Sequence, residues 1–466
     1  MHNDSSAGAL ADVLRPEVLA LRPGERLPSS RTLTGRHKVS PVTVTRALGL
    51  LVAEGLVVTR PGAGAFAADR PDAAPGPPDL GWQAVALGDR AVDAAGVSWL
   101  LSPPPDGTVA LSGGYPHPSL QPLRALAAAT ARAARRPAAW STPPLAGVPE
   151  LRAWFAQGVA GAAPADVLIA AGGQQALTTV LRAVPPPGSP LLVESPTYLG
   201  ALAVARACGL QPVPVPVDGE GVRPDLLAEA FALTGARALY CQPTFHNPTG
   251  ATMGAARRAR VLEAARAAGA FVIEDDYARH LAVDAPPPPL AAGDRDGRVV
   301  HIASLAKAVA PSVRIAAVIA RGPVAERIRA TQLVEGFFPS RPLQEALLEL
   351  VGSPAWARHL RELRTALRGR RDALAAALAR DLPGLAVNRP PGGLHLWARL
   401  PAGADDVAVT EVALRAGVLV SPGRPFFPAE PPAAHLRLTY GAAGSAAELE
   451  EGVRRLATVL PEAVAG

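Results

Sequence analysis

The choice of basic residues in the chain singles out one lysine. Lysine and arginine together number 46, and only Lys38 and Lys307 are lysines. Where arginine supplies almost all of the positive charge, a remaining lysine is a candidate amine nucleophile, a role arginine cannot fill. Ser304 and Arg314 flank Lys307 in the segment SLAKAVAPSVR (304–314). Together these groups suit a phosphate-bearing aldehyde: the amine forms a Schiff base, and the hydroxyl and guanidinium bind the phosphate.

Three further segments carry groups that suit the same small molecule. In FVIEDDY (271–277), an apolar strand delivers Asp275 to its end, where a carboxylate is able to keep a pyridine nitrogen protonated. In CQPTFHNPTG (241–250), the amide of Asn247 is able to hydrogen-bond a phenolate oxygen. In AAGGQQAL (170–177), a glycine pair opens a helix, whose N-terminus attracts anions. Each segment alone is explained as a solvated acid, a turn or a tight connection, but their combination predicts a cofactor site.

These segments follow apolar runs that alternate with helical patterns from about residue 120 onward. The alternation predicts an α/β sheet covered on both faces, with functional groups just beyond the carboxyl ends of its strands. From about residue 355, a long Arg-rich helix, two strands and a closing helix predict a smaller α+β domain. The predicted strands of the large domain are 167–170, 191–194, 238–242, 271–275, 299–303 and 315–320.

Length and composition favour a folded protein of several domains. A chain of 466 residues exceeds what a single core usually supports. Hydrophobic residues make up 49% and charged residues only 18%, which argues against disorder. No apolar run approaches the roughly 20 residues that span a bilayer, and the polar start does not resemble a signal peptide. Two cysteines cannot form a disulfide framework, so we expect a cytoplasmic protein.

The first part of the chain has a different pattern, which predicts a separate small domain at residues 8–68. Three short helices precede a two-stranded hairpin, and Pro16 is expected to kink or shorten the first helix. Between Glu25 and Glu54 all charged residues are basic, as expected for a surface that meets a phosphate backbone. The Pro- and Ala-rich residues 69–82 predict a stiff linker.

The two parts together resemble a known class of regulators. The segments PGERLPSSR (23–31), VSPVTVTRALGLLVAEGLV (39–57) and RPGAGAF (60–66) resemble a GntR-type winged helix-turn-helix domain. The cofactor segments resemble fold-type I aminotransferases of class I/II, in the same order along the chain. This is the layout of the MocR/GabR subfamily of transcription regulators. The resemblance implies an aminotransferase-like large domain at 83–350 and a small C-terminal domain at 351–466.

The resemblance also implies roles for individual residues around pyridoxal phosphate. Lys307 would form the Schiff base, and Asp275 would pair with the pyridine nitrogen. Asn247 and Tyr277 would contact the ring hydroxyl side, while Tyr198 would stack on the ring.

Phosphate and effector contacts are carried over in the same way. The phosphate would be bound by Gly173, Gln174, Ser304 and Arg314. Arg437 would hold an amino-acid carboxylate through a two-pronged contact. The chain departs from the family's usual hydroxyl or glycine residues at five positions: Ala170, Ala171, Ala306, Ser312 and Ala316.

For the N-terminal domain, the resemblance places the helix at 41–53 in the major groove of double-stranded DNA. Residues expected near its N-terminal half are Ser40, Thr43, Thr45 and Arg46. Residues expected to approach phosphates or the minor groove are Arg31, Arg60, Gly62 and Gly64. Aminotransferase sites of this type are completed across a dimer interface, so the resemblance also implies a homodimer.

Three functional hypotheses follow from the sequence. In the first, a transcription regulator senses an amine or amino acid through external aldimine formation, which changes how the N-terminal domain meets DNA. In the second, the chain is a working aminotransferase with an accessory DNA-binding domain. In the third, the large domain no longer holds the cofactor, for which the alanine substitutions are the motive.

Overall fold

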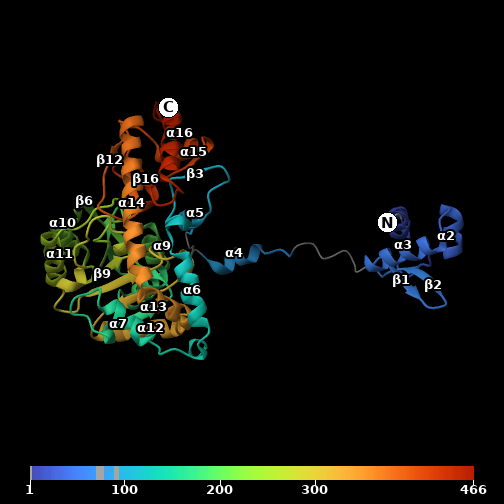
Figure 1. The fold of residues 1–466 in the computed structure, drawn as a ribbon, viewed down its shortest axis with the longest axis horizontal. Helices are drawn as coiled ribbons and strands as arrows, with labels where there is room; N and C mark the ends of the chain where they lie inside the picture. Colours follow the sequence, from blue (N-terminus) through green and yellow to red (C-terminus); the bar gives the residue numbers. More distant parts are fainter. Residues whose placement is uncertain (1–2, 70–77, 89–93, 466) are drawn as a thin grey trace. The chain divides into compact units, whose positions relative to one another are not determined.

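The computed structural model describes residues 3–69, 78–88 and 94–465 (Figure 1). The chain divides into two compact units between Arg90 and Ala91. Residues 3–69 are called the head below, and residues 94–465 the body. Most of the predicted linker at 69–82 lies outside the described residues; helix α4 follows at Gly81–Leu87. Among the described residues, no helix combines the length and apolar character that a membrane span requires.

The head is a three-helix domain with an antiparallel hairpin, drawn in blue in Figure 1. Leu33, Val44 and Leu51 are fully buried in its core. Ser29 and Ser40 cap the second and third helices by accepting hydrogen bonds from Thr32 N and Thr43 N, as their positions in the sequence suggest. The elements are α1 Asn3–Ala20, α2 Ser30–His37, α3 Pro41–Ala53, β1 Val57–Arg60 and β2 Gly64–Ala67.

From the sequence, Pro16 is expected to kink or shorten the first helix, and the shortening is wrong. Helix α1 spans 18 residues and continues through Pro16. A proline inside a helix removes one backbone hydrogen bond and costs about 3 kcal/mol. Leu10, Leu14 and Val18 are buried on the face of α1 that packs in the head core. Burial of each such side chain contributes roughly 1.5–3 kcal/mol, so packing outweighs the cost of the proline.

The body contains an eight-stranded mixed sheet in the order β4-β11-β10-β9-β8-β5-β6-β7. The central strands β10, β9, β8, β5 and β6 are parallel, whereas β11 runs antiparallel to both of its neighbours. The predicted α/β fold is confirmed. The strands are β4 Val167–Ala170, β5 Pro190–Ser195, β6 Gln211–Asp218, β7 Gly221–Val222, β8 Ala238–Cys241, β9 Phe271–Asp276, β10 Val299–Ser304 and β11 Ala316–Ile319.

Helices cover both faces of this sheet because successive strand residues point to opposite sides. In β9, Val272 belongs to one apolar core and Ile273 to the other. Helices α8 Gly173–Ala183, α9 Leu199–Ala207 and α12 Pro323–Gly336 pack in the core with Ile273. The core with Val272 includes residues of α6 Leu123–Ala134, α7 Pro149–Ala156, α10 Pro224–Thr234, α11 Ala255–Ala267, α13 Arg341–Val351 and α14 Pro354–Asp381.

The C-terminal part forms a second, four-stranded sheet in the order β12-β13-β16-β15. The long helix α14, orange in Figure 1, packs against the closing helix. The short strand β3 Val109–Ala110 pairs with β14, far along the chain. The other elements are α5 Ala95–Leu101, β12 Ala386–Val387, β13 His395–Arg399, α15 Asp406–Arg415, β14 Val418–Leu419, β15 Ser421–Pro422, β16 His435–Thr439 and α16 Ala446–Ala465.

Candidate functional site

A cavity lies at the carboxyl ends of the central strands. All nine residues predicted to contact a cofactor line it, although they come from five separate segments: Gly173, Gln174, Tyr198, Asn247, Asp275, Tyr277, Ser304, Lys307 and Arg314. Residues that the sequence did not single out also line it, among them Leu101, Tyr115, Gln242 and His395. The topology therefore gathers distant segments at one edge of the sheet, as expected for an α/β fold.

Lys307 lies in a turn directly after β10 rather than in a helix. Its Nζ atom donates a hydrogen bond to the Gly114 carbonyl oxygen and sits 3.5 Å from the centre of the Tyr115 ring. Burial, assisted by the positive charge of Arg437, lowers the pKa of Lys307 to about 7, and Asp275 opposes this shift only in part. A substantial share of the amine is therefore unprotonated near neutral pH, the form that attacks a carbonyl.

Asp275 is the next-to-last residue of β9 and is held by neutral hydrogen-bond donors. The hydroxyl of Tyr240 donates to Oδ2 over 2.7 Å, and Nε2 of Gln242 donates to the same oxygen over 2.8 Å. Among the described residues no hydrogen bond reaches Oδ1. Burial raises the pKa of Asp275, and the two hydrogen bonds only partly oppose that rise. A cationic partner at Oδ1 would stabilise the ionised form.

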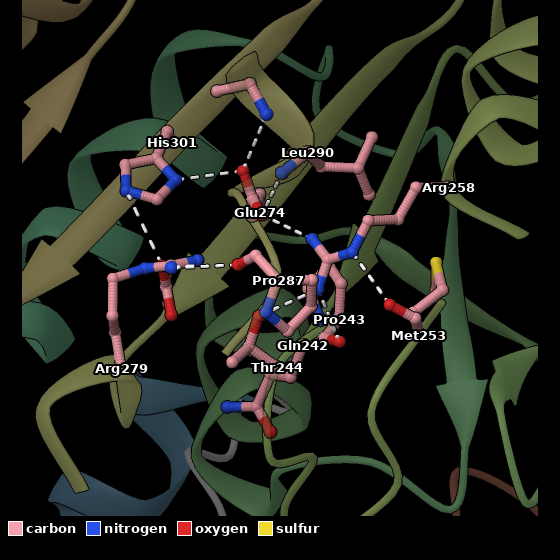
Figure 2. A network of polar contacts seen from close by, with 12 residues as sticks. Gln242, Pro243, Thr244, Met253, Arg258, Glu274, Arg279, Pro287, Leu290 and His301 are labelled. Carbon is pink, nitrogen blue, oxygen red and sulfur yellow. Dashed lines mark hydrogen bonds and ion pairs between the residues drawn. The ribbon is translucent and has the colours of Figure 1, made fainter. Parts of the chain in front are cut away.

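The acidic residues on either side of Asp275 face the other side of the sheet and enter a different environment. Figure 2 shows Glu274 between Arg258 and His301. Glu274 accepts hydrogen bonds from His301 Nδ1 at 2.9 Å and from two backbone N–H groups, those of Leu290 and Ala291. Burial raises the pKa of Glu274, but His301 and these N–H groups outweigh it, so the pKa lies below its ordinary value.

The glycine pair after β4, Ser304 and Arg314 lie together at one end of the cavity. Gly172 has a φ of 92°, and a Cβ atom there would lie 2.5 Å from Nη2 of Arg314. A Cβ at Gly173 would lie 3.5 Å from the Ser304 Cβ. The first turn of α8, a hydroxyl and a guanidinium thus surround one point, an arrangement that favours an anion.

The alanines that replace the family's usual residues differ in whether they reach this anion-binding end of the cavity. Ala170 is fully buried in β4, and Ala316 is fully buried in β11. Ala306 lines the cavity, so a serine there would add a hydroxyl that this chain lacks.

Arg437 lies on β16 beside the cavity and is fully buried. Its guanidinium donates to Asn247 Oδ1 over 3.1 Å and to the Gly113 carbonyl over 3.0 Å. Its Nε atom has no hydrogen-bond partner in the described residues, and the group stacks over Phe426 at 4.9 Å. A buried guanidinium with unused donor capacity suits an incoming carboxylate.

Three polar residues that line the cavity, Gln174, Tyr198 and Tyr277, form hydrogen bonds with the protein around them. Tyr198 donates its hydroxyl to Gln174 Oε1 over 3.0 Å, and Gln174 in turn donates to the Gly200 carbonyl. The hydroxyl of Tyr277 donates to the Phe245 carbonyl over 2.9 Å. Their rings are therefore fixed in place by hydrogen bonds within the protein.

In the head, the residues predicted to meet DNA lie along α3 and the hairpin. Ser40 and Thr43 form the N-terminal cap of α3 and share a hydrogen bond of 2.8 Å between their hydroxyls. Thr45 and Arg46 are exposed on the same helix, as is Arg31 on α2. Arg60 stacks over Phe66 of the neighbouring strand at 4.7 Å. Gly62 in the turn and Gly64 at the start of β2 are both exposed.

Two family models match the chain. A model described as aminotransferase class I and II matches residues 111–456, and a model of bacterial regulatory proteins of the gntR family matches residues 8–67. The HTH-type transcriptional regulator TauR of Rhodobacter capsulatus is 31% identical, covering 94% of this chain and 93% of TauR. A 2-aminoadipate transaminase of Thermus thermophilus is 33% identical, covering 76% of this chain and 90% of the enzyme.

Solved structures give the same result for the body. The α-aminoadipate aminotransferase LysN of Thermus thermophilus, complexed with N-(5'-phosphopyridoxyl)-L-leucine, superposes with a TM-score of 0.75 at 31% identity. The match covers 80% of this chain and 96% of LysN.

Proposed function

Because the chain belongs to the aminotransferase class I and II family and carries a gntR-family head, we propose that it is a DNA-binding transcription regulator that senses an amine or amino acid through bound pyridoxal phosphate. The main support is that Lys307, in the turn after β10, and Asp275, in β9, line a single cavity. The regulator TauR, which resembles the chain over both of its parts, supports the regulatory role.

The residues of the cavity fit pyridoxal phosphate. Arg314, Ser304 and the first turn of α8 offer donors to a phosphate, and Asp275 Oδ1 is open to a protonated pyridine nitrogen. When bound, pyridoxal phosphate supplies an aldehyde that condenses reversibly with amines and an electron-accepting ring. Lys307 would be the residue that holds it covalently, because it is a buried amine with a lowered pKa.

Arg437 would select an effector with a carboxylate. Its guanidinium is held in place by Asn247 and the Gly113 carbonyl, so little conformational entropy is lost when a carboxylate binds. Exchange of Lys307 for the effector amine at the cofactor would then free the lysine side chain. A regulator requires that this exchange favour one of two states of the protein over the other.

The proposed homodimer is supported by an exposed apolar patch on the body. Trp140 is 70% exposed, and Val334 and Phe337 at the end of α12 are 88% and 68% exposed. These parts of the chain are neighbours, because Arg341 after α12 donates a hydrogen bond to the Ser141 hydroxyl. Large exposed apolar side chains grouped in this way mark a protein interface. Sedimentation should show a dimer, and Val334→Glu should shift it towards monomer.

DNA binding and cofactor binding are tested on the same purified protein. A gel shift with DNA from the protein's own upstream region should show a complex at low salt that weakens as salt rises. Arg46→Ala and Arg60→Ala should weaken it, whereas Lys307→Ala should retain the shift but lose the visible absorbance of lysine-bound cofactor. Absence of a shift with or without cofactor would contradict the regulatory role. Absence of the visible band in wild type would favour a body that no longer binds the cofactor.

A second candidate function is a working aminotransferase. The similarity to the 2-aminoadipate transaminase favours it, as does the presence of Lys307, Asp275 and Arg437 around one site. Steady turnover between an amino acid and a 2-oxo acid, at the 1–1000 s⁻¹ typical of enzymes, would establish it. Effector-dependent DNA binding without such turnover would exclude it.

A further inference from the structure

One buried histidine of the cavity has no part in the proposed contacts with the cofactor. His395 begins β13, is 3% exposed, and lines the same cavity as Lys307. Its cross-strand neighbour is Thr439 of β16, and a hydrogen bond of 2.9 Å joins Nδ1 of His395 to the Thr439 hydroxyl oxygen. Arg437 lies two residues before Thr439, on the same face of the same strand.

The hydrogen bonds around Thr439 determine which ring nitrogen carries the proton. The Thr439 hydroxyl has one hydrogen, and it is placed to donate that hydrogen to the Gly113 carbonyl over 3.3 Å. Its oxygen then accepts from His395 Nδ1–H. The reverse assignment, in which Thr439 donates to Nδ1, makes one hydrogen bond fewer. The Nδ1–H form is therefore favoured, and Nε2 carries a lone pair.

The second ring nitrogen is open to the cavity. Among the described residues Nε2 has no hydrogen-bond partner. It is also not fully buried, so it faces free space in the cavity. Burial and the positive charges of Arg437 and Lys307 hold the pKa of His395 well below its ordinary value. The imidazole is thus neutral at physiological pH, and Nε2 acts as a hydrogen-bond acceptor.

Arg437, the cofactor and His395 would each contact a different functional group of the effector. The effector's carboxylate, bound to Arg437, has only acceptor oxygens, and these cannot hydrogen-bond to the lone pair of His395 Nε2. The effector's amino nitrogen is directed to the cofactor in place of Lys307. The donor that remains for Nε2 is on the effector's side chain. Resting on the proposed function, we propose that His395 is a specificity-determining residue, whose Nε2 accepts a hydrogen bond from an effector amino acid with a hydroxyl-bearing side chain.

An apolar effector would bury Nε2 without a partner. A buried acceptor that loses its hydrogen bond weakens binding by about tenfold, which corresponds to about 1.4 kcal/mol. We therefore expect hydroxyl-bearing amino acids to bind about ten times more tightly than apolar amino acids of the same shape.

The test is spectral titration of the cofactor-loaded, full-length protein with matched pairs of amino acids. The pairs are serine with 2-aminobutyrate, homoserine with norvaline, and 5-hydroxynorvaline with norleucine. At least one pair should show the tenfold preference for the hydroxyl. O-methylserine, which has an ether oxygen but no donor, should bind no better than norvaline, because it presents an acceptor to another acceptor.

Two variants assign the preference to His395. His395→Leu should abolish it by weakening the hydroxylated ligand, whereas His395→Gln, which is able to place an amide oxygen in the cavity, should retain part of it. Thr439→Val, which leaves His395 but removes the partner of Nδ1, should reduce the preference. Thermal melting establishes that each variant is folded, and if His395→Leu does not fold, the ligand pairs on wild type and Thr439→Val decide.

The outcomes separate this inference from the proposed function. Equal affinities within every pair, or a preference that survives in His395→Leu, would overturn the role of His395 while leaving the regulator intact. Tighter binding of the ether than of norvaline would show that Nε2 donates, which also overturns it. Absence of any cofactor band in wild type would overturn the proposed function and this inference together.

Discussion

The carboxylates on the two faces of strand β9 have opposite kinds of partners. On one face, Glu274 is surrounded by Arg258, His301 and two backbone N–H groups, so its charge is fully paired within the protein (Figure 2). On the other face, Asp275 has only the neutral donors Tyr240 and Gln242, both on one oxygen. The two residues are adjacent in sequence and both buried, Glu274 fully and Asp275 with 7% exposure, and they occupy opposite faces of the sheet.

The difference separates a structural charge from a functional one. A buried ion that serves stability must find its partners inside the protein, since an unpaired charge in the interior is costly. A buried ion that serves ligand binding must keep part of its hydrogen-bonding capacity free of protein partners. Asp276 faces the same side as Glu274 and is partly paired: its Oδ2 pairs with Arg279, while its Oδ1 is buried without a hydrogen-bond partner among the described residues. The clear contrast is therefore between Glu274, which is fully paired, and Asp275, whose Oδ1 is open to the cavity.

The largest expected effect comes from breaking the structural side of this comparison. Glu274→Gln removes the negative charge that pairs with Arg258 and His301. It also places an amide N–H₂ next to groups that themselves donate hydrogen bonds. Removing one member of a buried ion pair costs about 3–5 kcal/mol. We expect the unfolding free energy of the cofactor-free protein to fall by that amount in denaturant titrations. A loss below about 1 kcal/mol would show that the network around Glu274 does not stabilise the body.

The same acid-to-amide change one residue later should have a different result. Asp275→Asn keeps an oxygen for Tyr240 and Gln242, so we expect the unfolding free energy to change by less than about 1 kcal/mol. Cofactor affinity, in contrast, should fall because a charge-assisted hydrogen bond to the pyridine nitrogen is lost. Such bonds contribute about 1.5–3 kcal/mol, or roughly 10–150-fold in the dissociation constant. Titration of pyridoxal phosphate by absorbance measures it, and unchanged affinity would remove Asp275 from the site.

The pH dependence of stability should also differ between the two faces. The pKa of Glu274 is lowered by folding, so its contribution is present above the ordinary carboxyl pKa and is lost as pH falls through the folded value. The pKa of Asp275 is raised, so the folded state binds the extra proton, and stability falls as pH rises from the ordinary pKa to the folded value.

The variants make this difference measurable. One proton changes the slope by at most about 1.4 kcal/mol per pH unit. In the cofactor-free protein, Asp275→Asn should remove the fall in stability just above pH 4, and Glu274→Gln should remove a rise in stability that lies below the ordinary carboxyl pKa. Denaturant midpoints between pH 3 and pH 7 test this. Identical pH profiles for Asp275→Asn and wild type would contradict the raised pKa.

The sequence predicted the functional side of this comparison better than the structural side. Asp275 lies near the end of β9, and Lys307 and Asn247 lie in the turns beyond β10 and β8. Each follows an apolar run, which is a local pattern. The partners of Glu274 come from a helix, another strand and a short 3₁₀ helix at Leu290–Gly293, and a local pattern cannot indicate which of the many arginines pairs with it. The prediction of the fold succeeded for the same reason, since apolar runs mark most central strands.

What the sequence did not predict depends on pairing between distant segments. Tyr115 follows β3, a strand of two residues that pairs only with β14. Tyr240 is a typical core residue by type, and its contact with Asp275 follows from the register of β8 and β9. Strand β6 contains three prolines, which normally argue against a strand. In each case tertiary contacts decided the outcome, as they did for Pro16 in α1.

The smallest expected effect concerns the neutral donors that distinguish the functional face. Tyr240→Phe removes one hydrogen bond of 2.7 Å to Asp275 and leaves that of Gln242. A single neutral hydrogen bond contributes about 1 kcal/mol, so cofactor affinity should fall about fivefold. Tyr440→Phe is the matched control, because it removes a buried hydroxyl that bonds to the Gly392 carbonyl, away from Asp275. If both variants lost cofactor affinity equally, the effect would come from packing of the body; a loss confined to Tyr240→Phe, smaller than that of Asp275→Asn, would show that neutral donors hold Asp275 for its ligand.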